Sequence, residues 1–139
     1  MRRMMFAVFL FCFIQAYAKD PEIPEALLNA KIAYVQRSGA SEKDFTKLCE
    51  ALKKWGRFEL VQERKNSDIT IMLSSTVETR SMERPGASGG MMSNVQVLIN
   101  HIRIMDARND TLLWTDETSV YEKDPKILVS KLKSKMKKK

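Results

Sequence analysis

The chain has 139 residues, and its formal net charge is +7 at pH 7. The positive charge lies at the two ends: two arginines are among the first three residues and six lysines among the last nine, which leaves the body 16 basic residues against 17 acidic ones. The body therefore lacks the basic, aromatic-rich groove of a nucleic-acid-binding protein, and we expect no nucleic-acid partner.

Residues 1–18 have the three parts of a secretory signal peptide in order. Two arginines precede the apolar run at residues 4–14, and Ala16 and Ala18 occupy the positions that a signal peptidase reads. The run is shorter than the roughly 20 residues of a membrane-spanning helix. We expect a periplasmic or secreted protein whose mature chain begins at Lys19; a lipid anchor at Cys12 is disfavoured because Phe11 precedes it.

The first part of the mature chain predicts a lead-in, a strand and a helix. Residues 19–29 contain two prolines and form the lead-in to a single domain over 30–139. Residues 30–36 are apolar on both faces, which predicts a strand with neighbours on both sides. Ser41 is expected to cap a helix with one apolar stripe, and Gly56 is expected to end it at a positive φ.

Alternation of apolar residues predicts four more strands, at residues 58–62, 68–73, 94–106 and 111–118. Residues 74–93 are polar and hold two glycine-containing turn pairs, so we predict a long loop there. Because loops of this length are uncommon in compact domains, the segment could instead carry function or extend the flanking strands. In residues 94–106 the apolar positions change parity, which predicts a bulge or bend near Asn100.

A last helix is expected after Asp124 and Pro125, with Leu128, Leu132 and Met136 on its apolar side. The predicted order is therefore β-α-β-β-β-β-α. This order is typical of an α+β fold in which a small mixed or antiparallel sheet carries its helices on one face.

No combination of side chains indicates catalysis, a metal or a cofactor. His101 is the one histidine, whereas zinc and nucleophile–base sites draw on several such residues. Ser88 lies in a literal G-x-S-x-G sequence, but neither a strand nor a helix flanks it and no acid-then-histidine order follows, so a hydrolase is the least favoured function. Cys49 is either a small buried hydrophobe on the helix stripe or a reactive thiol.

The lysine-rich C-terminus has two interpretations. Its cations can complement the end of the last helix and raise solubility. Alternatively they touch an anionic membrane surface or polymer. The second interpretation involves the lysines at the very end of the chain, which are Lys133, Lys135, Lys137, Lys138 and Lys139.

Two blocks carry a resemblance. From Leu52 the chain reads L-K-K-W-G-R-F-E-L-V, then a turn and S-D-I-T-I, and from Ile104 it reads I-M-D-A-R-N-D-T-L-L-W. These blocks resemble those of a group of uncharacterised exported bacterial proteins. That group is similar in organisation to small envelope domains of the TolB N-terminal, LpoB and CsgG type. The resemblance implies an envelope α/β domain and transfers no catalytic residue.

Export, a complete small domain and the absence of a reactive cluster favour a non-enzymatic protein that binds another envelope protein. The polar segment 74–93 is the expected contact region, since an exposed segment between strands can take part in strand addition. Its candidate contact residues are Arg80, Arg84, Met91 and Met92. Binding of an anionic surface by the lysine-rich end is the alternative function.

Overall fold

A computed structural model describes residues 22–83 and 92–137. The expected signal peptide, Arg84, Ser88, Met91, Lys138 and Lys139 lie outside the described residues. In chain order the elements are α1 (Glu25–Asn29), β1 (Ile32–Ser38), α2 (Glu42–Trp55), β2 (Glu59–Val61), the 3₁₀ turn η1 (Arg64–Asn66), β3 (Ile69–Glu83), β4 (Met92–Asp106), β5 (Leu112–Glu117) and α3 (Lys126–Met136).

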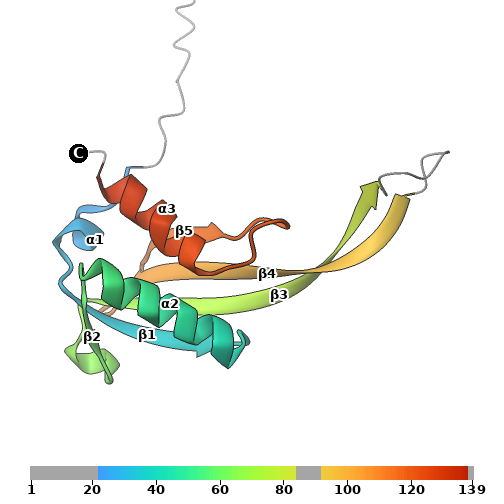
Figure 1. The fold of residues 1–139 in the computed structure, drawn as a ribbon. Helices are drawn as coiled ribbons and strands as arrows, with labels where there is room; N and C mark the ends of the chain where they lie inside the picture. The colour runs from blue at the N-terminus through green and yellow to red at the C-terminus, as the bar shows by residue number, and fades with distance from the viewer. Residues whose placement is uncertain (1–21, 84–91, 138–139) are drawn as a thin grey trace, which may run out of the picture.

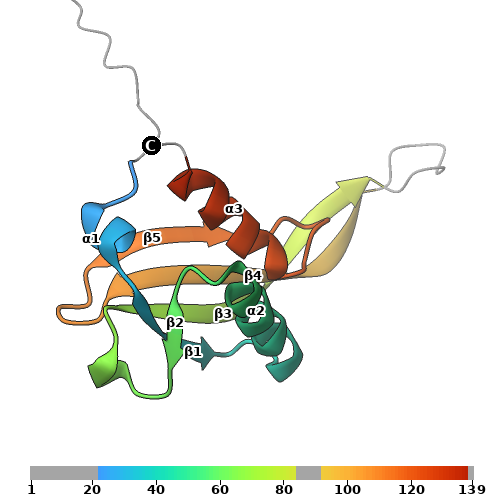
Figure 2. The same ribbon diagram turned by 60° about the vertical axis from the view of Figure 1, so that its left-hand side comes forward.

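The strands form one mixed sheet in the order β2-β1-β3-β4-β5. β1 is parallel to β2 and β3, whereas β3, β4 and β5 are antiparallel neighbours. Two views show α2 and α3 on the same face of this sheet (Figure 1, Figure 2). The predicted α+β class is therefore confirmed, with the short helix α1 added before the first strand.

The hydrophobic core lies between the sheet and the helices. Leu48 and Leu52 of α2 and Leu128 and Leu132 of α3 have no exposed surface. They pack on the sheet residues that point to the helix side, among them Ala33, Ile69, Ile71, Leu73, Ile102 and Ile104. Successive side chains of a strand point to opposite faces of the sheet. In each central strand, the side chains that point toward the helices therefore line the core.

The ends of α2 are those expected from the sequence. The Ser41 hydroxyl accepts a hydrogen bond from the Asp44 backbone N–H at 3.1 Å, which satisfies one of the free donors of the first turn. Gly56 has a φ of 69°, and its N–H bonds to the Leu52 carbonyl. A left-handed residue at this position costs least when it is glycine, so the helix ends there.

The described part of the lead-in, from Glu22 onward, contains the short helix α1. Leu27 of α1 has no exposed surface and Ile23 is 9% exposed, and both belong to the core. This helix before β1 therefore contributes to the packing of the domain.

The predicted long loop over 74–93 is wrong for its described residues, 74–83 and 92–93. β3 continues to Glu83 and β4 begins at Met92, and the two strands pair without interruption from Ile69↔Asp106 to Glu83↔Met92. The segment therefore extends the flanking strands, which was the alternative weighed for it. The sequence shows no alternation of apolar and polar residues here, because this part of β3 is rich in serine, threonine and charged residues.

No bulge lies at Asn100, because the β3–β4 register is continuous there. A register shift does occur where β4 pairs with β5, between Ile104 and Met105. The buried apolar residues of β4 do change from one face of the sheet to the other. Ile102 and Ile104 face the helices, whereas Val97 and Ile99 are buried on the other face and lie outside the main core.

Asp68 joins the beginnings of β1 and β3. Its carboxylate accepts hydrogen bonds from the backbone N–H groups of Lys31 and Ile32 at 2.9 and 3.0 Å. These two bonds lower the pKa of the Asp68 carboxyl below its ordinary value of 3.8. Hydrogen bonds to the ionised form favour it, so Asp68 contributes stability while it is deprotonated.

We expect Asp68→Asn to flatten the acid limb of the stability curve. The folded-state pKa is lowered, so the contribution of Asp68 is present above pH 3.8 and is lost as the pH falls through the lower folded-state value. Urea unfolding at a series of acidic pH values measures this. Glu59→Gln, at an exposed position of β2, is the matched control. Equal pH slopes for Asp68→Asn and the parent protein would contradict the role given to Asp68.

Candidate functional site

The outer halves of β3 and β4 form a two-stranded projection, which we call the arm (residues 75–83 and 92–100). β1 pairs with β3 only as far as Ser38↔Ser74, and β5 pairs with β4 only as far as Glu117↔His101. Beyond those pairs each strand of the arm has only the other as a described neighbour. In Figure 1 the arm runs on past α2 and α3 and curves away from the body.

The outer edge of β4 in the arm offers unpaired backbone groups. At Asn100 the backbone N–H donates to the Thr118 hydroxyl at 3.0 Å and the C=O accepts from the Thr118 N–H at 2.9 Å, so both groups point away from β3. Successive residues of an antiparallel strand alternate in this direction. Leu98, Gln96 and Asn94 therefore direct their backbone groups outward, where no strand among the described residues pairs with them.

This edge lacks the features that usually protect one. Proteins blunt free strand edges with lysine, proline, charged side chains or bulges. Residues 92–100 contain no charged residue and no proline, and their register with β3 has no bulge. The opposite strand of the arm differs, since it carries Glu78, Arg80 and Glu83.

Apolar side chains are exposed on both faces of the arm. Val77 and Leu98 are direct cross-strand partners and are 63% and 38% exposed. They lie on the face that carries the core further along the same strands. Val95 is 39% exposed on the other face, beside the buried Val97. A strand added to β4 would cover apolar surface as well as backbone groups.

Asn100 marks the point where the arm leaves the body, and its side chain has no exposed surface. Its amide oxygen accepts a hydrogen bond from the Ser75 hydroxyl, and its amide nitrogen donates to the Lys123 carbonyl at 2.9 Å and to Asp44 at 3.4 Å. With the Thr118 bonds to its backbone, Asn100 connects β3, α2 and the segment between β5 and α3. We call these contacts the Asn100 junction.

The expected contact residues are only partly placed. Arg80 lies on the arm and forms an ion pair with Glu78 at 2.8 Å. Met92 begins β4 and pairs with Glu83 through the backbone register. Arg84 and Met91 lie outside the described residues, as does Ser88. The edge residues Gln96 and Leu98, which the structure places at the open edge, were missed because they belonged to the strongest predicted strand.

The lysines of the C-terminal end do not share one face of α3. Lys133 borders a cleft between α2 and α3, whereas Lys135 lines a depression beside β5. Lys137 is exposed just after the helix. Positions two residues apart on a helix are separated by about 200° around its axis. Lys133 and Lys135 therefore lie on different sides of α3.

The remaining candidates for chemistry have ordinary surroundings. His101 lies on the face away from the helices, within 2.7 Å of the Thr76 hydroxyl and 3.2 Å of the Glu117 carboxylate. Burial raises the pKa of the half-buried Cys49 thiol, against a smaller effect of Lys53, which favours its protonated form. Across residues 22–83 and 92–137 no group of three or more potential metal ligands gathers, and no helix has the length and hydropathy of a membrane span.

No protein-family model matches the chain, and no curated protein matches it. The chain is similar in fold to several solved structures. Uncharacterized lipoprotein B of Nitrosomonas europaea is 16% identical, with 80% of this chain and 81% of that one covered and a TM-score of 0.49. A minor lipoprotein of Acinetobacter baumannii is 13% identical, with 76% and 90% covered and a TM-score of 0.46.

A PelC dodecamer from Paraburkholderia phytofirmans is 14% identical over 78% of this chain and 89% of that chain, with a TM-score of 0.41. Two of the three similar structures are thus lipoproteins by name. The resemblance to the TolB, LpoB and CsgG type stays a prediction from the sequence.

We expect Asn100→Ala to destabilise the protein by about 2–3 kcal/mol, because it removes the three hydrogen bonds of a fully buried side chain to its partly buried partners. Asn94→Ala is the matched control: Asn94 lies on the same strand and the same face, is exposed, and only accepts a bond from Ser81. It should cost less than about 0.5 kcal/mol. Urea unfolding measures both. Equal losses would show that the junction does not hold the fold together.

Proposed function

We propose that the protein is an exported, non-enzymatic binding module whose arm receives an extended segment of another envelope protein. The observation that carries the proposal is the open edge of β4, with its outward backbone groups at Asn94, Gln96 and Leu98. In strand addition the backbone supplies much of the affinity, and the side chains on alternate positions supply specificity. The N-terminal signal-peptide pattern supports export, and the partner is therefore sought in the cell envelope.

The added strand would continue the line of β5. β5 pairs with β4 up to His101, and Thr118 still bonds to Asn100, so the edge opens immediately beyond the body. A partner segment with apolar residues at alternate positions would lie against Leu98 on one face, and its intervening side chains would lie beside Val95 on the other face. The absence of charge over residues 92–100 favours a partner segment that is itself neutral.

Gln96→Pro tests this proposal with little effect on the arm itself. The Gln96 N–H points outward, so proline there removes a donor from the open edge and none from the β3–β4 ladder. With a photo-reactive side chain at Val77, which is 63% exposed, we expect a discrete crosslinked partner in intact cells. Gln96→Pro should abolish that crosslink and Gln96→Ala should retain it.

A probe at Leu112, which is 47% exposed on the body, controls for chance contacts. Circular dichroism and thermal melting show whether each variant folds. If Gln96→Pro does not fold, Asn94→Pro replaces it, because the Asn94 N–H also points outward and Val77 stays available for the probe. A crosslink from Val77 that persists in the folded Gln96→Pro protein would overturn strand addition at this edge.

The lysine-rich end supports a second candidate function, binding to an anionic surface. Lys133 and Lys137 are exposed, and each lysine near an anionic bilayer adds about 1 kcal/mol. We expect sedimentation with phosphatidylglycerol vesicles that weakens with salt and is lost when the residues after Met136 are removed. A variant with Lys43, Lys53 and Lys65 changed to Gln has the same loss of charge and should still bind. Binding that salt or the truncation leaves unchanged would rule this candidate out.

A further inference from the structure

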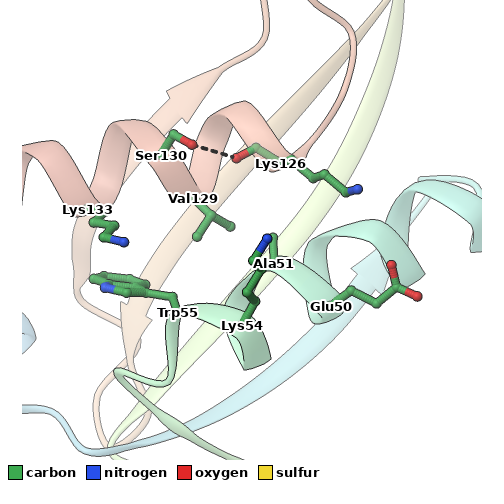
Figure 3. A pocket seen from close by; sticks show the side chains of 8 residues that line it. All are labelled: Glu50, Ala51, Lys54, Trp55, Lys126, Val129, Ser130 and Lys133. Atoms are coloured by element: carbon green, nitrogen blue, oxygen red, sulfur yellow. Dashed lines mark hydrogen bonds between the residues drawn. The ribbon is translucent and has the colours of Figure 1, made fainter.

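A cleft of about 410 Å³ lies between α2 and α3, away from the arm (Figure 3). Its apolar base is formed by Trp55 and Ala51 of α2 and Val129 of α3. The indole of Trp55 is half-buried and makes an edge-to-face contact with the buried Phe58, at 5.5 Å between ring centroids. That contact holds the Trp55 ring in place at the cleft without involving a residue on its rim.

Three lysines from two helices surround this apolar base. Lys54 comes from α2, and Lys126 and Lys133 come from α3. Glu50 is the one acidic residue in the lining, and in Figure 3 its carboxylate points away from Trp55. The lining therefore holds an excess of positive charge over a flat aromatic surface.

The three ammonium groups form no ion pair with a carboxylate in the described part of the chain. Other lysines on the same two helices differ: Lys47 lies 3.9 Å from Asp124, and Lys131 lies 3.3 Å from Asp116. In Figure 3 the ammonium groups of Lys54 and Lys133 lie beside Val129 and Trp55, whereas that of Lys126 points away from Trp55. Like charges without a counter-charge raise the positive potential of a cleft. Such a surface attracts an anion.

We propose that this cleft binds an aromatic anion, a ligand with a flat apolar body and a sulfonate, phosphate or carboxylate group. The body would lie against Trp55 and Val129, where burial of apolar surface favours it. The anionic group would receive charge-assisted hydrogen bonds from Lys54 and Lys133, whose ammonium groups lie beside Val129 and Trp55 in Figure 3. The proposal does not depend on the arm or on the function proposed for it.

The probe is anilinonaphthalene sulfonate, and its neutral analogue phenylnaphthylamine lacks the sulfonate. Trp114→Phe leaves Trp55 as the single tryptophan, so energy transfer from Trp55 to the bound probe reports occupancy near the cleft. In this background we expect saturable binding that weakens with salt, with at least about tenfold weaker binding of the neutral analogue. Two lost charge-assisted bonds are worth at least that factor.

Lys54→Gln with Lys133→Gln should weaken probe binding about tenfold or more. Lys43→Gln with Lys65→Gln removes the same charge at exposed positions outside the cleft and should leave binding unchanged. All four lysines are exposed, so these variants are expected to fold, and thermal melting checks it. The proposal is overturned if the cleft variant binds like the control variant, if the neutral analogue binds equally well, or if the probe gives no saturable transfer from Trp55 at millimolar concentration.

Discussion

One buried amide determines how this sheet changes from a covered body into an uncovered arm. Asn100 has no exposed surface, and its side chain is bonded to Ser75, Asp44 and the Lys123 carbonyl. A buried polar group is costly unless its partners have one geometry, so it specifies a single arrangement of the elements that meet there. At this junction β3, β4, α2 and the segment before α3 are held together, and beyond it the strands continue alone.

The arm depends on the body for its stability, since two strands by themselves are marginally stable in water. The body supplies the first part of both strands, and the continuous register carries the pairing outward. What the arm lacks is protection of the β4 edge, where nine consecutive residues carry no charge. An edge of this kind favours pairing with another strand, which connects the geometry to the proposed function.

The sequence predicted the body because local signals and packing agree there. Ser41, the apolar stripe and Gly56 define α2, an apolar run defines β1, and alternation defines the inner half of β4. The outer half of β3 could not be recognised, because Thr76, Glu78 and Arg80 show no apolar alternation and form a strand only through pairing with β4. The face change near Asn100 was visible in the sequence, but the β3–β4 register has no bulge there.

The candidate site was predicted only as a region. Arg80 and Met92 were expected contact residues and do lie on the arm, but the open edge depends on which backbone groups point away from β3, and sequence periodicity does not encode that. The charge-free run ending at Asn100 was the available signal. The basic cleft was missed because Trp55 and Lys133 are distant in sequence and meet only when α2 and α3 pack side by side.

Backbone amide exchange along β4, followed residue by residue by NMR on the isolated protein, tests the central claim most directly. The account predicts alternation within the arm: the amides of Gln96 and Leu98 exchange fast, whereas those of Val97 and Ile99 are protected by β3. Within the body, the amides of Ile102 and Ile104 are protected too, because β5 pairs with β4 there. Slow exchange at Gln96 and Leu98 would mean that the edge is already covered, and fast exchange at all four arm positions would mean that the arm does not form; either result contradicts the account.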